Sequence, residues 1–188
     1  MVPLNIPNAL TMLRIVAVPV VVVALLGEIP NGDTWAVNTI TAAAFTDGLD
    51  GWIARRKGDV TTFGKLMDPL ADKLLVVAAL VSLVSLDRLQ AWIAMVIIAR
   101  ELAVTGLRAV AVEYGVVLAA SWLGKLKTAL QVAAIIALIA VDPATTTVDA
   151  VVWAALIVTV WSGIDYFVGV RREIAQQAAD ADPAPTTP

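Results

Sequence analysis

The sequence predicts an all-α integral membrane protein with six transmembrane helices, on three observations. First, 60% of its 188 residues are hydrophobic and only 15% are charged, whereas a soluble domain is nearer half apolar and a quarter charged. Second, the apolar residues gather in stretches close to the roughly 20 residues with which a helix crosses a bilayer. Third, the Lys and Arg residues of the loops and helix ends lie almost entirely on alternate connections, which is typical of a multi-pass membrane protein.

Six apolar stretches follow one another, separated by breaks in which Gly, Pro and Asp are typical helix terminators. The predicted spans are residues 7–26, 35–53, 66–84, 91–107, 126–141 and 148–170. The fifth is short, so we expect its helix to begin earlier, near Ser121. We expect the first span to be retained rather than cleaved as a signal peptide. A signal peptide has a basic region before its apolar core, and Arg14 is the only basic residue before the apolar residues 15–26. Residues 1–172 then form one six-helix membrane domain, and residues 173–188 form a cytoplasmic tail that is partly disordered.

The basic residues predict the orientation of this domain. With six spans, both termini share one side of the membrane. The loops and helix ends on that side carry Arg55, Arg56, Lys57, Lys65, Arg108, Lys125, Lys127, Arg171 and Arg172. The loops of the other side hold only Arg88. The positive-inside rule therefore places both termini at the cytoplasmic face of the cell membrane. The formal net charge of −3 argues against a nucleic-acid partner.

An acidic segment, residues 47–72, interrupts the apolar chain beside a predicted cytoplasmic loop. Asp47 and Asp50 precede the loop, and Asp68 and Asp72 follow it. Spacings of three and four residues place each pair on one face of its helix, so the two helices could direct four carboxylates to one point. A carboxylate near lipid is costly unless it has a partner or a function. Ion pairs with neighbouring basic residues would account for single acids, but not for four at this spacing with glycines between them.

Four converging carboxylates would repel one another, so a bound divalent cation is their natural counterion. Ligation by oxygen alone favours Mg²⁺, with Mn²⁺ or Ca²⁺ as alternatives. The chain has neither His nor Cys, which excludes the usual zinc sites. A divalent-cation or proton-coupled transporter would also carry acids within the membrane. Transporters, however, usually place them near the midplane of repeated halves, and this chain has no evident repeat.

The acidic segment reads D-x-x-D-G-x-x-A-R, eight residues, then G-x-x-x-D-x-x-x-D, and it resembles the signature of the CDP-alcohol phosphotransferase family. The fixed positions present are Asp47, Asp50, Gly51, Ala54, Arg55, Gly64, Asp68 and Asp72. The resemblance implies six transmembrane helices of that family's type, a homodimer, and two Mg²⁺ ions, which Mn²⁺ can replace. It implies metal ligation by the four aspartates, with Asp72 also as the catalytic base. It implies that the CDP group binds to Asn8, Thr11, Gly51, Ala54, Arg55 and Gly64.

Three further runs look like the phosphatidylglycerophosphate synthase branch: N-I-P-N-A-L-T-M-L-R at residues 5–14, R-E-L-A-V-T-G-L-R at 100–108 and G-K-L-K-T-A-L-Q at 124–131. This resemblance implies transfer of the phosphatidyl group of CDP-diacylglycerol to sn-glycerol 3-phosphate, with release of CMP. The acceptor phosphate is then expected to bind Arg100, Arg108, Lys125 and Lys127. Phosphatidylinositol-phosphate synthases share the metal motif and also use a basic pocket, so they and other family members stay an alternative.

Simpler roles are also open to several of these residues. Lys125 and Lys127 can anchor the cytoplasmic helix ends. Arg14 can extend along its helix to reach the membrane interface. An ion pair between Arg100 and Glu101 is not expected, because chain neighbours on a helix point in different directions.

Overall fold

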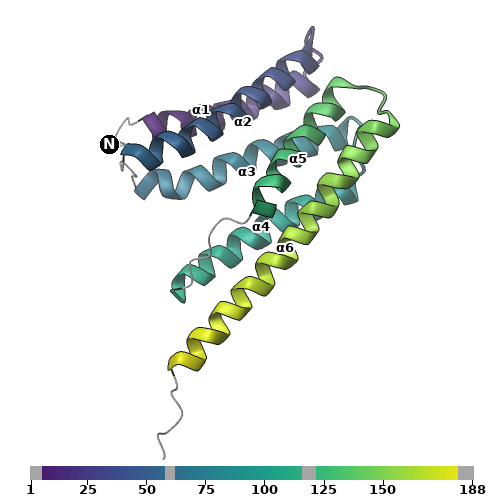
Figure 1. The fold of residues 1–188 in the computed structure, drawn as a ribbon. Coiled ribbons are helices and arrows are strands. Elements are labelled where there is room, and N and C mark those ends of the chain that lie inside the picture. Colours follow the sequence, from purple (N-terminus) through teal and green to yellow (C-terminus); the bar gives the residue numbers. More distant parts are fainter. Residues whose placement is uncertain (1–5, 58–61, 116–121, 182–188) are drawn as a thin grey trace, which may run out of the picture.

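The computed structural model describes the backbone of residues 6–57, 62–115 and 122–181, and the side chains of residues 11–46, 71, 73–115 and 122–176. Over these residues the secondary structure is entirely α-helical (Figure 1). The helices are α1 (Ile6–Leu26), α2 (Gly32–Lys57), α3 (Thr62–Ser85), α4 (Ala91–Glu113), α5 (Trp122–Ala140) and α6 (Thr146–Ala181). Each of the six predicted helices is confirmed, and α5 begins close to the expected Ser121.

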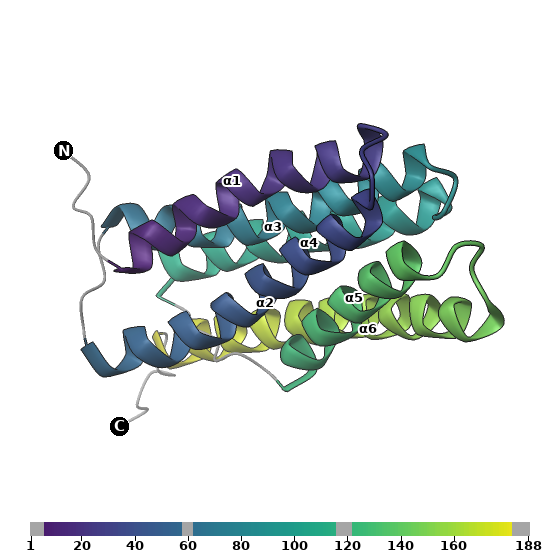
Figure 2. The same ribbon diagram turned by 90° about the horizontal axis from the view of Figure 1, so that it is seen from above.

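The helices form an elongated bundle in which neighbours along the chain are not always neighbours in space. Helix α1 packs against both α2 and α3, while α6 packs against α4 and α5. Helix α2 reaches across to α5, and α3 contacts α4 and α5, so the two groups are joined through the centre (Figures 1 and 2). The functional candidates on α4 and α5 are therefore positioned by α3 and α6 rather than by their own local sequence.

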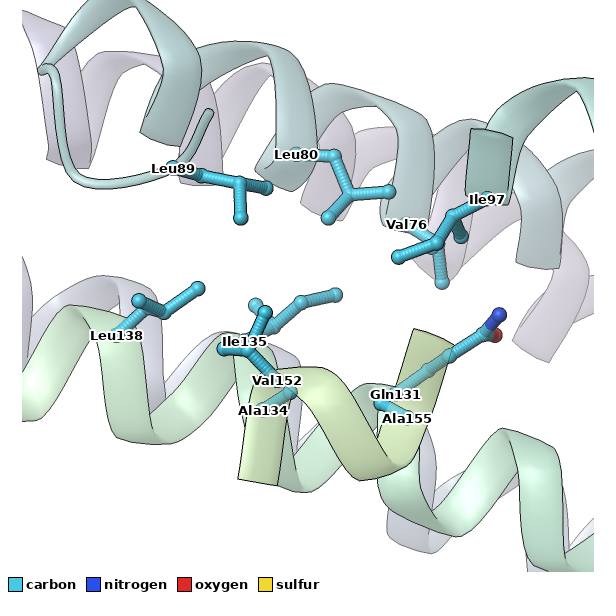
Figure 3. Close-up of a pocket in the computed structure, with 10 residues that line it drawn as sticks. All are labelled: Val76, Leu80, Leu89, Ile97, Gln131, Ala134, Ile135, Leu138, Val152 and Ala155. Atoms are coloured by element: carbon cyan, nitrogen blue, oxygen red, sulfur yellow. The ribbon is translucent and has the colours of Figure 1, made fainter. Parts of the chain in front are cut away.

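The centre of the bundle is closely packed. Val21 of α1, Leu83 of α3 and Ile139 of α5 are at most 1% exposed. A cavity between α3, α4, α5 and α6 measures only about 10 Å³, which is at the lower limit for one water molecule. Figure 3 shows its apolar lining, with Gln131 as the one polar residue among the ten that enclose it. The apolar lining of this cavity thus includes one polar side chain, that of Gln131.

Short connections join the helices at one end of the bundle, and Arg88 of the α3–α4 connection ties three of them together. Its Nη1 lies 3.0 Å from Asp33 Oδ1 at the start of α2, and its Nη2 lies 3.0 Å from Asp142 Oδ2 after α5. Nη1 also donates to the carbonyl oxygen of Ile139 at 3.4 Å. We call Arg88, Asp33 and Asp142 the Arg88 cluster. It fastens the ends of α2, α3 and α5 to one another.

Several large apolar side chains point outward, as expected for helices in contact with lipid. Trp122, Phe45 and Trp161 are 72%, 71% and 65% exposed, although soluble monomers rarely expose extensive apolar patches. Among the described residues, two helical segments are long and apolar enough to cross a membrane, Trp122–Ala140 and Thr146–Gln176. The apolar surface supports a membrane protein, and the full set of six spans stays a prediction.

Candidate functional site

The acidic segment lies on α2 and α3. The backbone is helical at Asp47 and Asp50 in α2 and at Asp68 and Asp72 in α3, which confirms the helical spacing that the sequence predicts. The side chains of these aspartates lie outside the described residues, as do those of Asn8, Gly51, Ala54, Arg55 and Gly64. Among the side chains that the structure does describe, no group of three or more acidic, His or Cys residues could hold a metal ion. The metal site therefore stays a prediction.

Two polar residues of α1 are buried in the bundle: Thr11, which is predicted to bind the CDP group, and Arg14. Thr11 is 1% exposed and Arg14 is 4% exposed, on a helix that packs against both helices of the acidic segment. The burial of Arg14 contradicts the simpler idea that its side chain extends to the membrane interface. A buried arginine in an apolar helix is costly, which makes a functional role for this face of α1 more attractive.

A buried polar cluster joins α4, α5 and α6. We call it the Glu101 cluster, and its members are Arg100, Glu101, Lys127, Gln131, Thr159 and Ser162. Oε1 of Glu101 accepts a hydrogen bond from Lys127 Nζ and another from Gln131 Nε2 at 3.4 Å. The side chains of Glu101 and Lys127 are 12% and 8% exposed. The burial of the Lys127 side chain contradicts a role for this residue as a simple anchor at the membrane surface.

The expectation that Arg100 and Glu101 would not form an ion pair is wrong, because Arg100 Nη1 lies 3.4 Å from Glu101 Oε1. The physical reason lies in the neighbouring helices. Lys127 attracts Glu101 toward α5, and α6 attracts Arg100, so both side chains meet at the junction of the three helices. Such partners cannot be seen in the local sequence of α4.

The side chain of Arg100 contacts α6 from its Cγ atom to its guanidinium group. Its Nε donates to the carbonyl oxygen of Thr159 at 3.0 Å, and its Nη2 donates to Ser162 Oγ at 2.8 Å. Gly163 permits this approach, since a Cβ atom there would lie 3.1 Å from Arg100 Cγ. All three guanidinium nitrogens thus have partners within the protein. These bonds use three of the five N–H donors of a guanidinium group, so Arg100 can keep these partners and still donate to a phosphate.

The other two cationic candidates are more accessible. Arg108 is exposed, and its Nε lies 3.5 Å from the hydroxyl oxygen of Tyr166, with the guanidinium 5.5 Å from the centre of that ring. Lys125 is exposed near the start of α5. The structure therefore brings Arg100 and Lys127 together at Glu101, and leaves Arg108 and Lys125 at the surface.

Further positive charge lies close to the Glu101 cluster. The ammonium group of Lys73 in α3 is near enough to Lys127 for their like charges to interact, and the charge of Arg108 likewise reaches Arg100. Lys73 directly follows Asp72 in the chain. The cluster is therefore a neighbour of the turn of α3 that carries the last aspartate of the acidic segment.

Sequence reasoning gave no role to four members of the cluster: Glu101, Gln131, Thr159 and Ser162. Thr159 and Ser162 are three residues apart in an otherwise apolar stretch of α6, which places them on one face of the helix. That spacing is a signal from which a polar contact within the membrane could have been predicted. Their partner on α4, Arg100, could not have been predicted from that spacing.

Comparison with known proteins gives consistent matches. A model of the CDP-alcohol phosphatidyltransferase family matches residues 4–161. The CDP-diacylglycerol–glycerol-3-phosphate 3-phosphatidyltransferase of Bacillus subtilis (strain 168) is 42% identical over 181 residues, covering 87% of this chain and 93% of the relative. The probable phosphatidylglycerophosphate synthase of Mycobacterium tuberculosis (strain ATCC 25618 / H37Rv) is 40% identical, covering 90% and 83%. A Rickettsia bellii relative with the same name as the Bacillus protein is 33% identical, covering 89% and 96%.

Proposed function

The chain belongs to the CDP-alcohol phosphatidyltransferase family, and from that premise we propose that it transfers the phosphatidyl group of CDP-diacylglycerol to sn-glycerol 3-phosphate. The products are phosphatidylglycerol phosphate and CMP. The observation that carries the proposal is the 42% identity, over 87% of this chain, to a relative named for this reaction. Family membership also argues against the ion-transporter alternative.

The donor set of the acidic segment fits a hard divalent cation. Asp47, Asp50, Asp68 and Asp72 would supply carboxylate oxygens only, at helical spacing on α2 and α3, and this chemistry suits two Mg²⁺ ions or Mn²⁺ in their place. Bound there, the metal would offset negative charge on the diphosphate and on the departing CMP. The same helices would hold the CDP group through Gly51, Ala54, Arg55 and Gly64, with Asn8 and Thr11 from α1.

The transfer step exchanges one phosphorus–oxygen bond for another. The acceptor's hydroxyl oxygen bonds to the phosphorus of the phosphatidyl group, and the bond from that phosphorus to the CMP oxygen breaks. Asp72 takes the hydroxyl proton, and CMP leaves with the bonding electron pair. Positioning both reactants on adjacent helices supplies most of what such a reaction needs from a protein.

A separate group of cations would receive the acceptor's phosphate, because the carboxylates and metals are committed to the diphosphate. Arg108 and Lys125 are exposed and available, while Arg100 and Lys127 contribute from the Glu101 cluster. Guanidinium and ammonium groups form strong charge-assisted hydrogen bonds to phosphate oxygens. This arrangement supports an acceptor that carries its own phosphate.

We test the reaction with purified protein, CDP-diacylglycerol, glycerol 3-phosphate and Mg²⁺, measuring the release of CMP. We expect release that requires all three additions and stops when the metal is chelated. Inositol phosphate replaces glycerol 3-phosphate in a parallel assay. A preference for inositol phosphate would establish the alternative branch, and the absence of CMP with any phosphorylated alcohol would refute the proposal.

The membrane arrangement is proposed with the reaction: six spans, both termini and the active site at the cytoplasmic face, and a homodimer. The number of helices and the distribution of Lys and Arg support the six spans and their orientation, and the family resemblance alone suggests the homodimer. Because the chain has no cysteine, Gly58→Cys provides a single labelling site between α2 and α3. It should react only from the cytoplasm, whereas Ser85→Cys at the end of α3 should react only from outside. The reverse pattern would invert the topology.

A further inference from the structure

We propose that Glu101 is a positioning residue for the acceptor phosphate. It holds the ammonium group of Lys127 at the junction of α4, α5 and α6. There the ammonium group donates a hydrogen bond to a phosphate oxygen of the acceptor. The inference rests on the proposed function and adds to it a carboxylate that would touch no substrate itself.

The contacts of Glu101 explain how it would act. Lysine has a long flexible side chain, and burying its ammonium group is costly unless a partner compensates. Oε1 of Glu101 is that partner, and Arg100 Nη1 and Gln131 Nε2 lie 3.4 Å from the same oxygen. Gln131 Nε2 also donates to Thr159 Oγ1 at 3.0 Å. The carboxylate is therefore held by donors from α4 and α5, and Gln131 links it to α6. Because Glu101 is fixed in this way, it also fixes the position of the Lys127 ammonium group.

The charge balance leaves Lys127 able to bind an anion. The Glu101 cluster itself contains two cations and one carboxylate, so it carries one surplus positive charge. Lys73 and Arg108 add like charges nearby. A phosphate monoester carries between one and two negative charges near neutral pH, and it would relieve this repulsion. One carboxylate is thus enough to place Lys127 without neutralising the region.

The position of the cluster suits an acceptor that must meet the acidic segment. Lys73 lies next to Asp72 in α3 and close to Lys127 of α5. An anion held by Lys127 would therefore lie on the side of α5 that faces α3, the helix that carries the proposed base.

The test removes the charge of Glu101 with little change of size. Glu101→Gln should raise the Km for glycerol 3-phosphate by about tenfold, since a charge-assisted contact to phosphate is weakened. The Km for CDP-diacylglycerol and kcat should change by less than about twofold, because other residues serve those steps. Glu113→Gln is the matched control, as it makes the same substitution at an exposed position of the same helix, and it should leave all three constants unchanged.

A double substitution separates positioning from a direct contact. If Glu101 acts through Lys127, then Glu101→Gln combined with Lys127→Met should give the same acceptor Km as Lys127→Met alone. If the increases in acceptor Km of the two single variants multiply in the double variant, the proposal is overturned. A lower kcat in Glu101→Gln with an unchanged acceptor Km would also overturn it. Should Glu101→Gln fail to fold, Glu101→Asp keeps the charge and withdraws it from Lys127, and a normal acceptor Km in that variant would overturn the proposal equally.

A binding measurement distinguishes this inference from the proposed reaction. Without CDP-diacylglycerol, glycerol 3-phosphate or inorganic phosphate should raise the midpoint of thermal unfolding of the wild-type protein. The shift should be smaller in Glu101→Gln and unchanged in Glu113→Gln. Wild-type protein that is stabilised but releases no CMP would refute the reaction and keep the anion site. Wild-type protein that anions do not stabilise would refute Glu101 positioning, because the surplus charge would then be balanced within the protein.

Discussion

The bundle holds two polar clusters of opposite construction. In the Arg88 cluster one cation lies between two carboxylates, each about half exposed to water. In the Glu101 cluster two cations share one carboxylate, and all three side chains are at most 13% exposed. One cluster is therefore rich in acceptors and partly hydrated. In the other, the described side chains are little exposed to water and include more cations than carboxylates.

The difference separates a structural role from a functional one. The hydrogen bond to Asp33, together with the charges of Asp33 and Asp142, raises the pKa of Arg88 above its ordinary value despite partial burial. That cation needs nothing from outside the protein. A buried cluster with a surplus cation is costly until an anion arrives. The difference supports the proposed binding of the acceptor's phosphate at the junction of α4, α5 and α6, whereas Arg88 fastens the helix ends.

The largest expected effect compares two aspartates at opposite ends of α2. Asp50→Asn should lower turnover by a factor of about a hundred or more, because it removes a charged ligand from the proposed metal site. Asp33→Asn changes the partner of Arg88 and should leave turnover near normal. CMP release by both purified variants measures the contrast. Near-normal turnover in Asp50→Asn would remove the acidic segment from the active site.

The next effect compares two exposed or partly exposed arginines. Arg108→Ala should raise the Km for glycerol 3-phosphate roughly ten- to a hundredfold, as expected for the loss of a charge-assisted phosphate contact. The Km for CDP-diacylglycerol should change little, and Lys125→Ala should behave similarly. Arg88→Ala serves as the control with an unchanged acceptor Km. If Arg108 and Lys125 variants both keep the normal value, their charges serve only to orient the helices in the membrane.

A smaller effect concerns stability. Arg88→Gln should lower the free energy of unfolding by about 1 kcal/mol, the upper range for partly exposed ion pairs, and lower Tm by about 2–4 °C. Arg171→Gln, at an exposed position of α6, should leave Tm unchanged. Thermal unfolding of the two variants in the same detergent provides the comparison. Equal Tm values would mean that the Arg88 cluster does not fasten the helix ends.

The smallest effect concerns pH. A cation whose pKa is raised by folding stabilises the protein fully below its unfolded-state pKa, and this contribution is lost only as the pH rises through the higher folded-state value. For Arg88 that window lies above the ordinary arginine pKa. The difference in Tm between wild type and Arg88→Gln should therefore stay constant from about pH 7 to about pH 10. A steady decrease over this range would indicate that another titrating group carries the effect.

Much of the architecture was predictable because it depends on local patterns. Apolar stretches bounded by Gly, Pro and Asp give all six helices, and the predicted span 91–107 lies within α4 (Ala91–Glu113). The aspartates of the acidic segment have helical spacing in the sequence and a helical backbone in the structure. Each of these features depends on residues within a few turns of one another, which is the range over which helix periodicity and capping act.

Tertiary structure alone decided the partners of the buried charges. Arg100 binds Thr159 and Ser162, 59 and 62 residues further along the chain, and Glu101 binds Lys127 across 26 residues. No periodicity within α4 indicates which helix will cover a given face of it. The sequence therefore left Lys127 as either a membrane anchor or a phosphate ligand, and it argued against an ion pair between Arg100 and Glu101. Packing of α5 and α6 onto α4 removes these side chains from water, and only then must each charge find its partner.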